Sequence, residues 1–173
     1  DSAGEVLASG STAVTVPPQG NVEATVIPCR DLRWRKGAAD CVPGNIADKA
    51  RGLLGQYVGD RDLLVWMEVV EGDQVLSRNL TLFARPKHLD LRRPEIRAEV
   101  SATGDGGFAI RLASDVPALW TRLELAGTDA RFSDNFLHLD GRNEQVVVCR
   151  PKEALDLAQI RERLRVESLA DTY

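Results

Sequence analysis

Aromatic residues are scarce in this chain of 173 residues, which has three tryptophans, two tyrosines and four phenylalanines. Histidine is rarer still, since only His88 and His138 are present. The three cysteines, Cys29, Cys41 and Cys149, lack the tight spacing with each other or with a histidine that a zinc site needs. We therefore expect no metal ion and no other cofactor.

Long hydrophobic runs are also missing, because no apolar stretch approaches the ~20 residues that a membrane span needs. The first residues, Asp1-Ser-Ala-Gly, do not show the charged and then apolar pattern of a leader. We expect no membrane partner.

An excess of basic charge is the third absence. Residues 1–89 carry 11 acidic and 10 basic side chains, and residues 90–173 carry 15 and 12. Nucleic-acid binding requires a basic face, so no nucleic-acid partner is expected.

The cysteines leave two interpretations open. Cys29 and Cys41 bracket a polar loop, where they form either a local disulfide or a pair of reduced thiols. A disulfide requires an oxidising compartment, so the disulfide interpretation implies a periplasmic or secreted protein. Cys149 ends the apolar run Val146–Cys149, so we expect it to be a small core residue.

What the chain does contain is alternation of apolar and polar residues, the pattern of β-strands. In residues 1–89 the best hairpin is formed by Asp62–Val70 and Gln74–Phe83 around Glu71-Gly-Asp73. Further strands are expected at 5–9, 13–16 and 22–27. This region supplies about five strands where a sandwich has about seven, so it is expected to be a partial β-sandwich. A long insertion, residues 29–59, interrupts it and includes an expected short helix at 45–54.

Residues 84–94 hold two prolines and five charges, which predicts a linker before a second domain at residues 90–173. Five short strands follow at regular spacing, and Asp156-Leu-Ala-Gln159 matches the capping box of a helix that runs to about Leu164. A final strand or tail is expected at 165–169. The five strands are expected at 95–101, 107–113, 119–126, 135–139 and 144–150. The predicted fold is all-β: tandem immunoglobulin-like β-sandwich domains, the first incomplete, with one short C-terminal helix.

Three segments carry a family resemblance. Phe132-Ser-Asp-Asn-Phe136 and the terminal Ser168-Leu-Ala-Asp-Thr-Tyr173 resemble the last immunoglobulin-like domain of bacterial β-mannosidase-type enzymes of glycoside hydrolase family 2. The stretch Arg78–Leu91 resembles the hinge between the last two sandwich domains of those enzymes. The resemblance covers most of residues 70–173, and it is weaker over residues 1–60.

The resemblance implies a longer protein, a retaining exo-glycosidase that removes terminal β-D-mannosyl residues from oligosaccharides. Its partners would be the upstream domains and the oligosaccharide substrate. Such an enzyme uses two carboxyl groups about 5 Å apart. The family carries them on a (β/α)8 barrel of about 250 residues, which does not fit in this chain. The chain is therefore expected to be a non-catalytic C-terminal fragment with no catalytic residue.

Two alternatives remain open. The same region could belong to an exo-β-glucosaminidase, or the chain could be a carbohydrate-binding or interaction module outside any enzyme. A carbohydrate-binding module would require exposed aromatic side chains in a row.

Individual residues support the non-catalytic interpretation. Four glutamates on the expected strands are predicted to face solvent, and neither histidine stands near a Gly-x-Ser-x-Gly turn. Trp66 and Trp120 are expected in the core, and Phe132 and Phe136 are expected to anchor it on either side of a corner shaped by Asp134-Asn135. The four glutamates are Glu23, Glu68, Glu99 and Glu124.

Trp34 is the exception among the aromatics, since it stands between Arg33 and Arg35-Lys36 in the long insertion. A large aromatic among basic residues is unlike a core residue. Three roles stay open for Trp34: lining a sugar site, docking on a neighbouring domain, or covering its own loop.

Overall fold

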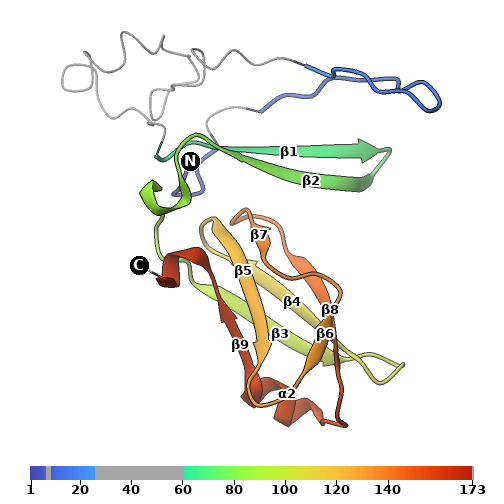
Figure 1. The fold of residues 1–173 in the computed structure, drawn as a ribbon, viewed down its shortest axis with the longest axis vertical. Helices are drawn as coiled ribbons and strands as arrows, with labels where there is room; N and C mark the ends of the chain where they lie inside the picture. Colours follow the sequence, from blue (N-terminus) through green and yellow to red (C-terminus); the bar gives the residue numbers. More distant parts are fainter. Residues whose placement is uncertain (7–8, 26–60, 173) are drawn as a thin grey trace. The chain divides into compact units, whose positions relative to one another are not determined.

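The computed structural model describes residues 1–6, 9–25 and 61–172. The chain divides into two compact units, one made of Asp1 with Glu5–Asp90 and the other of Ser2–Gly4 with Leu91–Tyr173. Figure 1 shows the elements of both. Each unit is described by itself below.

The first unit contains the expected hairpin. Strand β1 (Leu64–Glu71) pairs antiparallel with β2 (Gln74–Leu82), with a register shift between Val69 and Val70. The turn contains Gly72, whose φ of 58° lies in the left-handed region that glycine adopts without steric cost. The hairpin prediction is confirmed.

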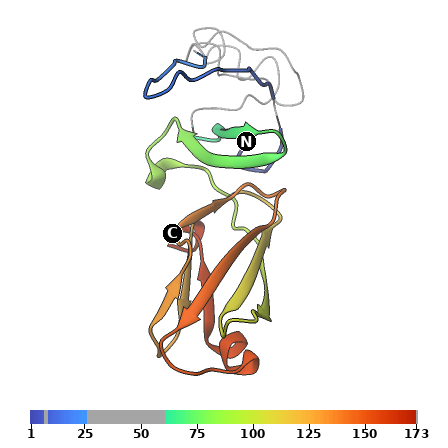
Figure 2. The same cartoon turned by 90° about the vertical axis from the view of Figure 1, so that its right-hand side faces the viewer.

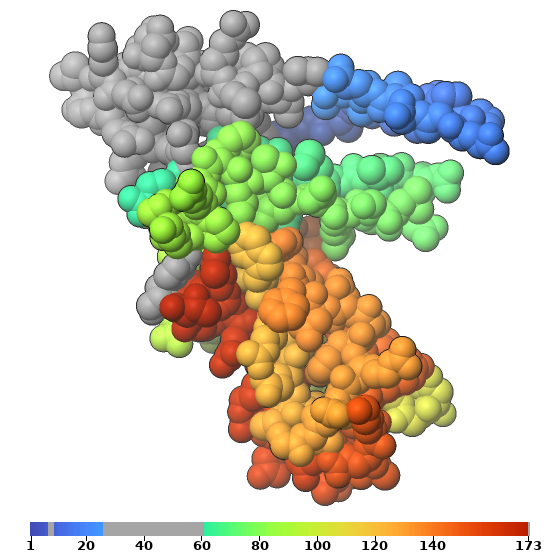
Figure 3. Space-filling model, viewed as in Figure 1, coloured from blue at the N-terminus to red at the C-terminus, as the bar shows by residue number. Residues whose placement is uncertain are grey.

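The side chains of this hairpin lie largely at the surface, as Figure 3 shows for its green strands. Met67 is 44% exposed, and Val69 and Val70 are 56% and 57% exposed. Trp66 is half-buried, so the prediction that it is a core residue is wrong. The hairpin has too few strands in the described residues to enclose that side chain on both faces.

The three strands expected near the N-terminus are not found in the described residues of 5–9, 13–16 and 22–27. A turn is present between the last two segments, where the backbone N–H of Gly20 donates to the carbonyl of Pro17 at 3.0 Å. Near the start, the N–H of Glu5 donates to the Asp1 carboxylate at 2.9 Å, which closes a turn. Alternation predicts an extended backbone, but a strand also requires a partner edge.

The end of the first unit is an ordered connection. A 3-10 helix, Pro86–His88, lies between β2 and Leu89, which is buried. The guanidinium of Arg61 pairs with the Asp90 carboxylate at 2.5 Å, and its Nε donates to the carbonyl of His88 at 2.6 Å. These contacts fix residues 86–90 against the start of the hairpin region.

The second unit is a two-layer β-sandwich. The four-stranded sheet has the order β3-β4-β8-β6, and the three-stranded sheet has the order β7-β5-β9. Figure 2 shows the two layers from the side. The strands are β3 (Ile96–Ala102), β4 (Phe108–Ser114), β5 (Ala118–Leu125), β6 (Ala130–Phe132), β7 (Leu137–Leu139), β8 (Gln145–Pro151) and β9 (Leu164–Glu167).

The core lies between these sheets because their strands alternate. In β4 every second residue is buried, from Phe108 to Ser114. Cys149 is fully buried, as expected, and burial raises the pKa of its thiol. The main cluster consists of Val100, Phe108, Ile110, Leu112, Ala118, Leu123, Leu125, Leu137, Leu139, Val147, Cys149 and Ile160.

Helix α2 (Leu157–Arg163) confirms the capping-box prediction. The Asp156 carboxylate accepts from the N–H of Gln159 at 2.8 Å, and the Gln159 side chain accepts from the N–H of Asp156 at 2.9 Å. Ile160 is fully buried and joins the core cluster. The chain then forms β9, pairing antiparallel with β5, and ends in a 3-10 helix, Leu169–Thr172.

Two features of the second unit differ from expectation. Strand β6 was not anticipated; it pairs with β8, and Phe132 packs against the core as expected. The strand expected at 135–139 begins only at Leu137, and Phe136 is 58% exposed rather than a core anchor. Its φ of 58° turns the backbone away from the strand conformation.

Candidate functional site

Trp34, Cys29 and Cys41 lie outside the described residues. The three roles considered for Trp34 and the two states of the cysteine pair therefore stay predictions. The described candidates are the Phe132–Phe136 segment, the second and third tryptophans, the histidines and the strand glutamates.

Asn135 is the central residue of the Phe132–Phe136 segment. Its Oδ1 accepts from the backbone N–H of Leu123 at 2.8 Å, and its Nδ2 donates to the carbonyl of Leu123 at 2.9 Å. The same Oδ1 accepts from the N–H of Phe136 at 2.9 Å, and Asp134 accepts from the N–H of Asn135. The segment shapes a corner through side-chain to backbone bonds, as predicted.

The position of Trp120 is the main correction. Ala118 pairs with Leu139 and Thr121 with Leu137, so Leu119 and Trp120 both lie opposite His138 in a β-bulge. The bulge leaves Leu119 buried and Trp120 only half-buried, with a φ of 48°. The prediction that Trp120 is a core residue, by resemblance to the buried strand tryptophan of immunoglobulin-like sandwiches, is therefore wrong, because the extra residue of the bulge places Leu119 in the core instead.

His138 is held by the same bulge. The Trp120 and His138 rings meet edge to face at 5.0 Å, and the backbone N–H of Trp120 donates to His138 Nδ1 at 3.1 Å. Burial lowers the pKa of His138, and the Asp134 charge opposes this. An imidazole whose Nδ1 accepts a hydrogen bond from the backbone is part of the fold.

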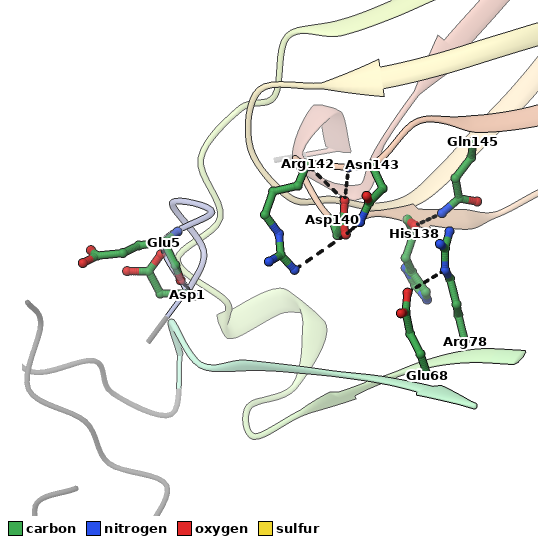
Figure 4. Close-up of polar contacts among 9 residues, drawn as sticks. All are labelled: Asp1, Glu5, Glu68, Arg78, His138, Asp140, Arg142, Asn143 and Gln145. Atoms are coloured by element: carbon green, nitrogen blue, oxygen red, sulfur yellow. Dashed lines mark hydrogen bonds and ion pairs between the residues drawn. The ribbon is translucent and has the colours of Figure 1, made fainter. Parts of the chain in front are cut away.

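The loop after β7 is organised by Asp140, as Figure 4 shows. Its Oδ1 accepts from the N–H groups of Arg142 and Asn143 at 2.9 and 2.8 Å, and its Oδ2 accepts from Asn143 Nδ2 at 2.7 Å. Burial alone would raise the pKa of Asp140, but these donors and the Arg142 charge lower it. Gly141 permits a close approach, since a Cβ there would meet the Val116 backbone at 2.9 Å.

The four glutamates expected to face solvent, Glu23, Glu68, Glu99 and Glu124, are exposed, although Glu23 does not lie on a strand. Glu68 pairs with Arg78 across the hairpin at 2.8 Å (Figure 4). Among the described residues, no group of His, Cys, Asp or Glu could hold a metal ion, and no helix is long and apolar enough to cross a membrane. The described side chains thus build corners, turns and caps.

Comparisons with known proteins agree with this architecture. A family model described as a mannosidase Ig/CBM-like domain matches residues 1–88, and a mannosidase model described as an Ig-fold domain matches residues 91–172. The comparison with curated proteins gives no match.

Among solved structures, the β-D-mannosidase of Dictyoglomus thermophilum is similar, with a TM-score of 0.53 and 21% sequence identity. The match covers 61% of this chain and only 13% of that one. At this identity the likeness shows the fold alone.

Proposed function

Because the chain belongs to the family of mannosidase Ig/CBM-like domains, we propose that it is the non-catalytic C-terminal region of a longer retaining exo-glycosidase that hydrolyses terminal β-D-mannosides. The family models confirm the resemblance to C-terminal immunoglobulin-like domains of mannosidase-like enzymes. The fold and these domains support a glycosidase-associated immunoglobulin-like module. The specific sugar and reaction are the proposed part.

The observation that carries the proposal is the succession of two mannosidase-type domains, over residues 1–88 and 91–172. Retaining glycosidases need two carboxyl groups about 5 Å apart. In the proposed enzyme these stand on a barrel of about 250 residues, longer than this chain. Carboxylates among the described residues have structural roles instead, since Asp140 binds backbone N–H groups of its loop and Asp156 caps helix α2.

The test compares this chain with the full product of its gene on an aryl β-D-mannoside. We expect turnover by the full product and none by the chain. Turnover by the chain itself would overturn the non-catalytic assignment. A full product that cleaves the aryl β-D-glucosaminide in preference to the mannoside would contradict the proposed sugar.

Trp34 offers a second experiment on the full product. We propose that Trp34 docks on a neighbouring domain, rather than lining a sugar site or covering its own loop. Replacing it with alanine should then leave oligosaccharide affinity unchanged in calorimetry while lowering the stability of the full product. A loss of affinity without a loss of stability would assign Trp34 to a sugar site.

A further inference from the structure

The C-terminal sandwich, residues 91–172, has a groove between two edge strands. Strand β3 ends the four-stranded sheet and β9 ends the three-stranded sheet, and both line a groove of about 830 Å³. Inward-facing positions of the two strands line it: Ile96, Ala98 and Val100 of β3, and Leu164 and Val166 of β9. The groove also extends over the outer face of the four-stranded sheet, where its lining residues are Glu99, Ser101, Ala109, Arg111 and Val146.

Ala98 shows that this inner face is incompletely covered. It lies between Ile96, which packs against the core, and Val100, which is 6% exposed. Alternation places all three on the inner side of β3, yet Ala98 is exposed. In a closed sandwich the opposite sheet would cover this position.

Comparison with the immunoglobulin topology identifies what would cover it. The order β3-β4-β8-β6 matches strands A-B-E-D of a constant-type domain, and β5 takes the place of strand C. Strand β9 follows β8 in the chain and pairs with β5, so it takes the place of strand F, while β7, on the other edge of β5, has no counterpart in the constant-type order. In that topology strand G pairs with F, whereas the only partner of β9 among the described residues is β5.

The side chains of β9 do not close its free edge. Leu164 and Val166 face the core, so alternation turns Arg165 and Glu167 to the outer face. Arg165 donates to the carbonyls of Glu162 and Leu164, and Glu167 lies 3.9 Å from Arg122. Neither charge is positioned to block a strand in the groove.

Arg161 adds a charge requirement at one end of the groove. Its Nη2 donates to the carbonyl of Val100 at 3.0 Å, and the described residues include no carboxylate within ion-pair distance of it. The exposed guanidinium favours an acidic residue in the occupant. Because the Arg161 guanidinium already binds the Val100 carbonyl of β3, we expect an added strand to form its backbone hydrogen bonds with β9.

We propose that this groove binds an extended peptide strand supplied from outside the sandwich, which pairs with β9 in the position of strand G. The strand has apolar residues at alternate positions and an acidic residue at the Arg161 end. Backbone pairing supplies affinity, and the alternate side chains supply specificity by entering the groove. This inference stands independently of the proposed glycosidase function.

The test uses the full 173-residue chain, labelled with ¹⁵N, and an acetylated and amidated peptide, Thr-Val-Thr-Val-Thr-Val-Thr-Asp. We expect saturable shifts of the Leu164–Glu167 amides and slower hydrogen exchange there. A peptide of the same composition with its three valines consecutive is the matched control. Equal shifts with both peptides, or none at β9, would overturn the proposal.

Ala98→Lys fills the groove with a charged side chain and should weaken peptide binding at least about tenfold. Ala102→Lys, at another exposed position of β3 outside the groove lining, should leave binding unchanged. Equal effects of the two variants would contradict the site. If sedimentation shows a dimer that Ala98→Lys makes monomeric, a second copy fills the groove and the proposal of a peptide from another source fails.

Discussion

At the scale of one residue, the side chain of Asn135 takes the place of a partner strand beside part of β5. Thr121 pairs with Leu137, so continuing the register places Leu123 opposite Asn135. The β7 strand does not extend that far, and the Asn135 amide donates to and accepts from Leu123 in its place. An amide side chain provides one donor group and one acceptor, as a peptide unit does.

Replacing Asn135 with alanine should lower the free energy of unfolding by about 2 kcal/mol, because the Leu123 N–H and carbonyl lose their partner in a part-buried site. Urea denaturation measures this loss. Asn143→Ala is the control, since the Asn143 side chain donates only to the exposed edge of the Asp140 loop, with an expected loss below about 1 kcal/mol. Equal losses would contradict the pairing role of Asn135.

Asp105 gives a prediction for pH. Hydrogen bonds from Thr103 and Arg150, together with the Arg150 charge, lower the pKa of Asp105 from 3.8 to about 2. A carboxyl with a lowered folded-state pKa stabilises above its unfolded-state pKa, and this contribution is lost as the pH falls toward 2. The urea midpoint of the natural chain should exceed that of Asp105→Asn at pH 6, and the difference should shrink between pH 4 and pH 2. A pH-independent difference would contradict the charge pairing.

At the scale of elements, the sequence predicted those helices and turns that residues close together in the chain determine. The β1–β2 hairpin follows from alternation around Glu71-Gly-Asp73, and helix α2 follows from the Asp156 capping box. The bulge at Leu119 and Trp120 could not be predicted, because one extra residue is visible only against the partner strand β7.

The missed features of the candidate site have the same cause. Phe136 has the large apolar side chain of a core anchor. However, the Asn135 side chain accepts from its backbone N–H and its φ is positive, so its side chain faces solvent. Strand β6 was missed because three residues give too little alternation to recognise, although Arg131 stands between the less exposed Ala130 and Phe132. Trp34 lies outside the described residues, so its predicted role is still untested.

Helix α2 is short, and isolated helices of this length are marginal, so its caps matter. Asp156→Ala should lower the free energy of unfolding by about 1 kcal/mol, because the N–H of Gln159 loses its acceptor. Urea denaturation checks this, with Asp156→Ser as the variant that should restore most of the loss. If serine and alanine are equally destabilising, the capping bond does not carry the effect.

At the scale of the molecule, the C-terminal sandwich holds the main core by itself. The cluster and the hydrophobic residues packed against it extend from Ile96 to Val166, and residues 91–172 match one Ig-fold domain model. Every strand pairing of this sandwich is also internal to it. Cooperative unfolding requires such a self-contained core.

A fragment of residues 91–173 is therefore expected to fold alone, with a single cooperative urea transition and amide shifts that match those of the full chain. Its stability should be somewhat lower, because Ser2, which is 5% exposed, belongs to the same compact unit and is absent from the fragment. Adding a peptide of residues 1–6 should restore part of the lost stability if Ser2 binds the sandwich without a covalent link to it. A broad, non-cooperative transition of the fragment would show that the core between Ile96 and Val166 depends on residues before Leu91, and the division of the chain near Asp90 would then be wrong as a description of its folding units.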